Sequence, residues 1–226
     1  MLASVVIFSV ACWLFSMPSS ESHALIAGIA GASLALSGSL NLSFFLKIIL
    51  YTFIACAFSF FISYATSKAL KLYLPYSRLQ VASCLGTSFM HGAQDGQKFV
   101  GILLFLSRGG KDVSPLPLII MVGVVLFLGT LLGGGRIVKS MGEGIVRLSP
   151  KSAFISDMGA TISLIICSII GIPVSTSNIK ACSVAGAGLG ENQRVNYKIL
   201  VKMTYIAIIT FPVCTLISYL LVRLLA

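Results

Sequence analysis

The sequence predicts an all-helical integral membrane protein, and its composition supports this in two ways. Of its 226 residues, 57% are hydrophobic and only 10% are charged, whereas a soluble domain carries about 25% charged residues. The apolar segments are long, and they lack the alternation of polar and apolar residues that is typical of barrel strands. We therefore expect several helices that cross the cell membrane.

The basic residues and the cysteines exclude several classes of function. The net charge is +10, but the basic residues cluster in short connectors, as they do in the cytoplasmic loops of membrane proteins. The six cysteines are scattered singly, without the spacing of a metal site or a disulfide framework. We expect no nucleic-acid partner, no organic cofactor and no metal site other than one for sodium.

The chain opens with two short apolar segments, residues 2–16 and 23–40, on either side of a serine-rich turn. A helix of 15 residues reaches about 22 Å, less than the hydrocarbon core of about 30 Å. We therefore expect a broken helix or a re-entrant hairpin around residues 18–23. Helix starts leave backbone N–H groups free to hold an anion, so Ser20 and Ser22 are candidate anion ligands.

Longer apolar segments follow. Residues 46–70, 116–132 and 204–225 are long enough to span a bilayer. Residues 80–107 are also apolar, except for a polar motif in their middle, and we expect that helix to be interrupted near Gly92–Gly96. Residues 136–149 mix basic and apolar side chains, which predicts an amphipathic helix on the membrane surface.

The polar motif His91–Lys98 contains the strongest candidate site residues. A charged group at the centre of a bilayer costs at least about 2.5–3.5 kcal/mol, so such residues usually have a function. Asp95 and Lys98 are three residues apart and share one face of a helix. Asp95 is a candidate cation ligand, Gln94 can contact either ion, and Lys98 either binds an anion or only neutralises Asp95. The alternative is a water-exposed loop, against which the apolar flanks argue.

A second interrupted segment lies near the end of the chain, where Ser175, Thr176 and Ser177 follow Pro173. Like Ser20 and Ser22, these three residues are candidate anion ligands, through their hydroxyl groups and the free N–H groups of a helix start. A shift of 155 residues superimposes the turn at 18–23 on the turn at 173–178. Interrupted hydrophobic segments in two halves are typical of transporters with inverted repeats. We expect an incomplete inverted repeat, with a first half over 1–75 and a second over 76–226, in which only the second half carries the polar motif.

Together, the polar motif 91–98 and the two turns resemble the inorganic phosphate transporter (PiT) family of permeases. That family carries a Gly-x-Asn-Asp signature followed by a Pro-x-Ser-Thr/Ser-x-His turn in each repeat. Here Gln94 replaces the usual Asn, Asn178 replaces the usual His, and the first signature is absent. The resemblance implies phosphate uptake coupled to Na⁺ or H⁺.

Three interpretations of the function stay open. The first is a phosphate transporter whose N-terminal half is supplied by a separate chain or by a homo-oligomer. The second is a permease for sulfate or another oxyanion, and the third is a truncated or assembly subunit that does not transport. An enzyme is not expected, because no nucleophile or metal cluster accompanies His91 and Asp95.

The remaining polar residues are assigned weaker roles. Glu21 and Asp157 are secondary candidates for cation ligands, because each lies near one of the two turns. His23 and His91 are expected to be structural. The serines and Thr176 of the two turns could instead only cap helices.

Overall fold

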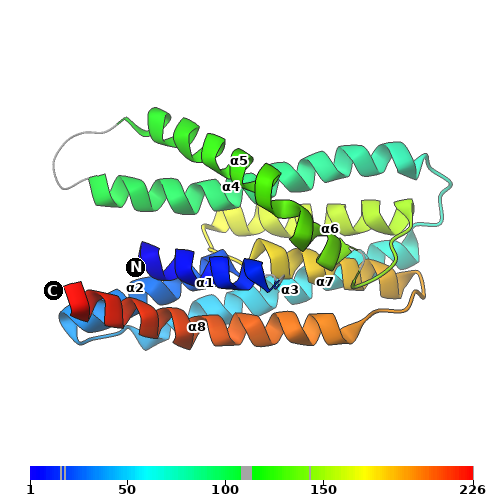
Figure 1. Ribbon diagram of the computed structural model, residues 1–226. Helices are drawn as coiled ribbons and strands as arrows, with labels where there is room; N and C mark the ends of the chain where they lie inside the picture. The colour runs from blue at the N-terminus through cyan, green and yellow to red at the C-terminus, as the bar shows by residue number, and fades with distance from the viewer. Residues whose placement is uncertain (16, 18, 108–113, 143, 226) are drawn as a thin grey trace.

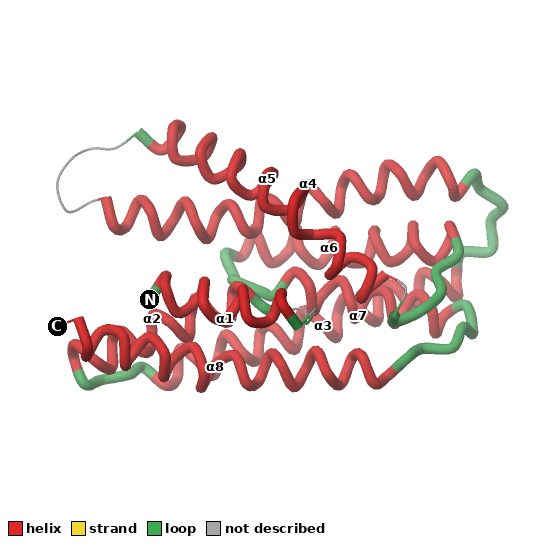
Figure 2. The backbone as a smooth tube through the Cα atoms, in the orientation of Figure 1, coloured by secondary structure: helices red, strands yellow, loops and turns green. Residues whose placement is uncertain are grey.

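The computed structural model describes residues 1–226 except 16, 18, 108–113, 143 and 226, and it does not describe the side chains of 136–142. In these described residues the chain forms helices and loops only (Figure 2). The helices are α1 (Leu2–Leu14), α2 (Glu21–Ser37), α3 (Leu42–Ala69), α4 (Tyr76–Ser107), α5 (Pro115–Gly142), α6 (Pro150–Ile170), α7 (Thr176–Gly190) and α8 (Tyr197–Leu225).

Four helices of the described residues, α3, α5, α6 and α8, are long and apolar enough to cross a membrane. Apolar side chains on their outer faces are exposed, such as Val124 and Phe127 on α5, as expected for a protein whose surround is lipid. The prediction of an all-helical membrane protein with several spans is confirmed.

Two expected features of the chain are absent from the described structure. Helix α4 runs without a break through Gly92 and Gly96, because a glycine weakens a helix by only about 0.5–1 kcal/mol. The surface helix expected over 136–149 is not a separate element. Its first part continues α5 to Gly142, and the chain from 145 to 149 is not helical and leads into the capping box with which Ser149 starts α6.

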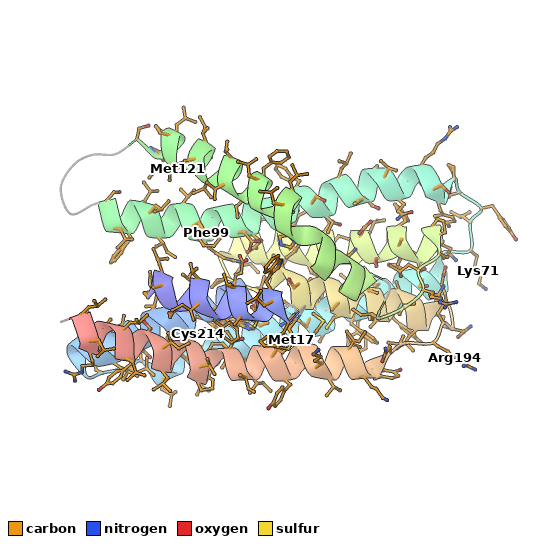
Figure 3. The ribbon with its side chains drawn as sticks, viewed as in Figure 1. Met17, Lys71, Phe99, Met121, Arg194 and Cys214 are labelled. Carbon is orange, nitrogen blue, oxygen red and sulfur yellow. The ribbon has the colours of Figure 1, made fainter. Side chains whose placement is uncertain are left out.

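Two helical hairpins, α2–α3 and α7–α8, run in opposite directions from the middle of the bundle. Helices α2 and α7 both begin at the centre, next to the loops that precede them, and the α2–α3 and α7–α8 connections lie at opposite ends (Figures 1 and 2). In Figure 3, Lys71 and Arg194 mark the end of the bundle that holds the α7–α8 connection. The broken-helix arrangement expected around the two turns is therefore present, although Pro18 itself lies outside the described residues.

The hairpins exchange partners: α7 of the second hairpin packs on α3 of the first, and α2 packs on α8. A Cβ atom added at Gly186 would meet the Phe60 carbonyl oxygen at 2.2 Å, and one at Gly31 would meet the Thr215 carbonyl oxygen at 2.1 Å. These two glycines are 155 residues apart, and so are their two partners. The shift found in the sequence thus also relates the closest backbone contacts.

Candidate functional site

The candidate site lies where the starts of α2 and α7 meet the middle of α4. Ser20 begins α2 as its N-cap, accepting a hydrogen bond from the His23 N–H. Ser175 begins α7 in the same way, accepting from the Asn178 N–H. Both caps are preferred residue types for a helix start, and the two helix starts lie side by side because Ser22 donates to the Val174 carbonyl oxygen at 2.8 Å.

Lys98 joins the three elements of the site. Its Nζ donates to Ser22 Oγ at 2.6 Å, to Asp95 Oδ1 at 3.0 Å and to the Val174 carbonyl oxygen at 3.1 Å. An ammonium group has three donors, and these contacts use all of them. One positive charge therefore bridges the polar motif of α4 and both turns.

Asp95 is buried within the bundle, with 9% of its surface exposed. Its second oxygen, Oδ2, lies 3.1 Å from His91 Nε2, and His91 in turn lies 3.2 Å from Thr176 Oγ1. The carboxylate is thus placed between a lysine and a histidine, and each of them also contacts one of the helix starts. The structure excludes the alternative of a water-exposed loop around Asp95.

Gln94 is held against α6. Its Nε2 donates to Ser168 Oγ at 2.8 Å and to the Leu164 carbonyl oxygen at 3.4 Å. These contacts fix the amide against α6. Its carbonyl oxygen is then the group that remains for an ion, and the side chain is buried.

The serines of the two turns divide into structural and site residues. Ser20 and Ser175 act as caps, which uses their side-chain oxygens. Ser22 and Thr176 reach across to α4, through Lys98 and His91 respectively. Ser177 lies half-buried on the first turn of α7.

Glu21 lies at the first turn of α2 and is exposed. It is close enough to Asp95, Lys98 and His91 for its charge to interact with theirs. In the described structure this places a second carboxylate at the edge of the same site. His23 follows Ser20 by three residues. Its side chain contacts α3 instead of the site, with Nε2 3.3 Å from Thr52 Oγ1.

Asp157 belongs to a second polar cluster between α4, α6 and α7. Ser83 donates to its Oδ2 at 3.0 Å, and Lys180 pairs with its Oδ1. Asp157 lies eleven residues before Ser168 on α6, a separation of about 16 Å along a helix. The structure therefore does not bring Asp157 together with Gln94 and Asp95.

Three participants in the site were not selected from the sequence as ligands: His91, Ser168 and the Val174 carbonyl. The spacing of His91 and Asp95, four residues apart on one helix face, was the signal that could have indicated their pairing. Ser168 and Val174 reach the site only through tertiary packing. No group of three or more His, Cys, Asp or Glu side chains in the described part of the chain could hold a metal ion.

Comparison with known proteins identifies the family. The model of the phosphate transporter family matches residues 1–75 and 72–218. The chain belongs to this family. Because this is a family of transporters, the expectations of a multi-pass membrane protein and of a non-enzyme are confirmed.

Relatives within the phosphate transporter family are longer than this chain. A probable low-affinity inorganic phosphate transporter of Rhizobium meliloti (strain 1021) is 30% identical over 241 residues, which cover 96% of this chain and 70% of the relative. A protein of the same description from Mycobacterium bovis is 28% identical, covering 96% of this chain but only 57% of the relative. The chain thus spans little more than half the length of some of the curated relatives that it matches.

A solved structure of another protein has the same fold. This structure, described as the sodium-dependent phosphate transporter, has a TM-score of 0.85 at 18% sequence identity, and the match covers 99% of this chain and 78% of the other. At this identity the likeness concerns the fold alone. It supports the arrangement of helices described above.

Proposed function

We propose that this chain carries inorganic phosphate across the membrane together with a cation. The observation that supports this most directly is the position of Lys98, whose ammonium group contacts both Asp95 and Ser22 at the paired helix starts. A site of this kind offers an anion a positive charge and hydroxyl groups, and it offers a cation a carboxylate. The descriptions of the bacterial relatives name inorganic phosphate as their substrate.

Phosphate is proposed to bind between the starts of α2 and α7. The N-terminus of a helix carries partial positive charge and free N–H groups, which suit an anion. Ser22, Thr176, Ser177 and Lys98 would contact the phosphate oxygens, and Ser20 and Ser175 would keep the helix starts in shape as caps. Half-helices whose N-termini face an anionic substrate near the middle of the membrane are typical of secondary transporters.

The coupling cation is proposed to bind at Asp95, with the Gln94 carbonyl oxygen and Glu21 as further ligands. Asp157 is the weaker candidate, because it lies in a separate cluster with Ser83 and Lys180, away from Gln94 and Asp95. A relative named sodium-dependent phosphate transporter 1, from Pongo abelii, matches 64% of this chain at 28% identity, which favours Na⁺. A proton would use the same carboxylate.

The two halves, 1–75 and 76–226, are proposed to be an inverted repeat. The 155-residue shift maps α2 and α3 onto α7 and α8. The packing of α2 on α8 and of α3 on α7 supports the proposed repeat. A signature helix equivalent to α4 in the first half would complete the symmetry. We propose that a separate chain supplies it.

Uptake of labelled phosphate by proteoliposomes that contain this chain tests the proposal. We expect uptake to require a gradient of Na⁺ or of H⁺, and to fall to background in Asp95→Asn, because the neutral amide no longer attracts a cation. Detergent extraction and size-exclusion chromatography would show that the variant is inserted and folded. Uptake that is unchanged in Asp95→Asn would remove Asp95 from the mechanism.

Sulfate competition separates phosphate transport from the second interpretation, an oxyanion permease with another substrate. Protonated phosphate carries a hydroxyl group that needs an acceptor, which Asp95 provides, whereas sulfate at neutral pH has none. We therefore expect excess sulfate to leave phosphate uptake unchanged. A complete lack of phosphate and sulfate movement, with or without a co-expressed N-terminal half from a longer relative, would favour the subunit that does not transport.

A further inference from the structure

A row of polar side chains continues along α4 beyond the candidate site. Ser83, Thr87, His91, Asp95 and Lys98 recur every three or four residues, so they share one face of the helix. Ser83 and Lys98 are 15 residues apart, about 22 Å along a helix. The row therefore leads from the starts of α2 and α7 toward the end of the bundle where α4 begins.

This end of the bundle carries many basic residues. Figure 3 places Lys71 and Arg194 there, next to the α3–α4 and α7–α8 connections. Lys68, Arg78 and Lys198 lie next to the same connections in the sequence. Because the cytoplasmic loops of membrane proteins carry an excess of basic residues, we expect the row to join the candidate site to the cytoplasmic side.

A second ion pair flanks the part of the row that lies closest to this end. Lys180 follows Thr176 by one turn of α7 and pairs with Asp157 of α6. Asp157 also accepts a hydrogen bond from Ser83 of the row at 3.0 Å, and Thr87 donates to the Asp157 carbonyl oxygen at 3.1 Å. Charged residues within membrane-spanning helices such as α6 are rare, and they usually mark the path of an ion.

The basic groups along the row are more accessible than the carboxylates. The side chains of His91 and Lys180 are 49% and 29% exposed, whereas those of their partners Asp95 and Asp157 are 13% and 10% exposed. Charged groups in contact with hydrocarbon are costly, so we expect water on the accessible side of the row. An ion that moves along this side meets nitrogen donors before it meets carboxylates, which favours an anion.

Lys180 keeps a hydrogen-bond donor for such an anion. Its Nζ donates to Asp157 Oδ1 and to Ser156 Oγ, the latter at 3.3 Å, and an ammonium group has three donors. Within the described residues the third donor has no protein partner, whereas Lys98 uses all three of its donors. Both carboxylate oxygens of Asp157 already have partners, Lys180 and Ser83. The group that remains in this cluster is thus an N–H donor, which suits an anion.

We propose that Lys180 forms a second phosphate site, which phosphate occupies on its way between the candidate site and the cytoplasmic side. This inference rests on the proposed transport of phosphate. The free donor of Lys180 binds a phosphate oxygen, and Asp157 holds the ammonium group in place while no phosphate is bound. The nearby carboxylate also keeps the anion from binding tightly, and a site on a path has to release its ion.

Labelling of introduced cysteines tests whether anions travel along the row. The chain is placed in lipid nanodiscs with its exposed Cys84 replaced by serine, and mass spectrometry measures modification by the anionic sulfonatoethyl methanethiosulfonate. We expect Thr87→Cys to react, and saturating phosphate to slow the reaction. Leu85→Cys is the matched control, because Leu85 is 68% exposed on the other face of α4, where lipid keeps the charged reagent away.

A second variant tests the role of Lys180 without leaving an unpaired charge. Lys180→Met alone would leave Asp157 without its cation, so the double variant Lys180→Met/Asp157→Asn is used, and size-exclusion chromatography checks its fold. We expect the anionic reagent to label Thr87→Cys about tenfold more slowly in this variant, the smaller end of the effect of charges that line a cleft. The cationic trimethylammonium-ethyl methanethiosulfonate should not be slowed. Lys180→Arg, which keeps the charge, should leave both rates unchanged.

Each of three results contradicts the proposal. Thr87→Cys that reacts no faster than Leu85→Cys would show that the row is closed to ions. A rate with the anionic reagent that is unchanged in Lys180→Met/Asp157→Asn would leave the lysine as a counter-ion of the aspartate only. Labelling of Thr87→Cys that phosphate does not slow would show that phosphate does not bind along the row.

The proposed transport fails in a different way. A chain that takes up no phosphate, although phosphate slows the labelling of Thr87→Cys in a manner that depends on Lys180, would contradict the transport and retain the second site. Uptake that persists while phosphate leaves the labelling unchanged would contradict the second site and retain the transport.

Discussion

Lys98 neutralises Asp95, and its ammonium group can also bind phosphate as a point charge. A double-mutant cycle distinguishes the two. If Lys98 binds phosphate, we expect Lys98→Met to raise the phosphate KM about 10- to 100-fold, the value of a hydrogen bond to a charged group. The double variant Lys98→Met/Asp95→Asn should then bind phosphate no better than Lys98→Met alone.

Binding of labelled phosphate to the purified chain measures this cycle without requiring transport. If the double variant regains the affinity of the unmodified chain, the lysine serves only to neutralise the aspartate. Lys98→Arg is the matched control, since it keeps the charge. Its affinity should lie between those of the unmodified chain and Lys98→Met.

Serine residues of the two turns should respond differently to the same substitution. Ser22 contacts Lys98 and the Val174 carbonyl oxygen, so Ser22→Ala should weaken phosphate binding as well as lower thermal stability. Ser175 caps α7, so Ser175→Ala should lower the free energy of unfolding by about 1 kcal/mol. Thermal unfolding and phosphate binding of both variants check the assignment, and a weakened affinity in Ser175→Ala without loss of stability would contradict it.

At the scale of helices, the close approach of backbones holds α2 against α8 and α3 against α7. In a membrane, small residues at helix interfaces allow the packing that replaces the hydrophobic effect. Gly31→Ala and Gly186→Ala would push a Cβ atom to 2.1 and 2.2 Å from a backbone carbonyl oxygen, which no flexible side chain can relieve. We expect each to lower stability by about 1–3 kcal/mol, as overpacked cores do.

Gly123 provides the control for these variants. An added Cβ atom there meets nothing within 4 Å, so Gly123→Ala in α5 should leave stability unchanged or raise it by up to about 1 kcal/mol through helix propensity. Thermal unfolding in detergent measures all three. Gly31→Ala and Gly186→Ala with unfolding temperatures equal to that of Gly123→Ala would show that the α2–α8 and α3–α7 contacts are looser than described.

The continuity of α4 shows where a sequence argument about an element fails. Glycine and charged residues within an apolar segment predict a break in the helix. The polar side chains of α4 find partners on α6 and α7 instead, as the contact of Thr87 with Thr161 at 2.9 Å illustrates. In a membrane, backbone N–H and C=O groups must be hydrogen-bonded within the helix. A continuous α4 therefore has a lower free energy than a broken one.

For the whole molecule, the sequence predicted the hairpins and their 155-residue relation, because the Pro/Ser turns and the Gly/Ala-rich segments repeat locally. It also indicated that Asp95 is buried, since the flanks of the motif are apolar. It did not predict which helix packs on which. The exchange of α2 and α7 depends on contacts between residues more than a hundred positions apart, such as Ser63 with Ser183, and the partners of Gln94 and Lys98 follow from that packing.

The exchange of hairpins raises the question of whether α7 packs on α3 of its own chain or of a second copy. Ser63 and Ser183 are fully buried, and their Oγ atoms lie 2.6 Å apart. Within one chain, Ser63→Cys/Ser183→Cys should therefore form an intramolecular disulfide on oxidation, because the two side chains already meet at bonding range.

Electrophoresis under non-reducing conditions distinguishes the two packings, and mass spectrometry of the linked peptides separates this disulfide from any that involves the six native cysteines. We expect the linked chain to migrate as a monomer. A linked dimer would show that two copies exchange hairpins. Ser63→Cys/Ser218→Cys is the control, and it should not cross-link, because Ser218 lies on α8 and donates to the Gly28 carbonyl oxygen of α2.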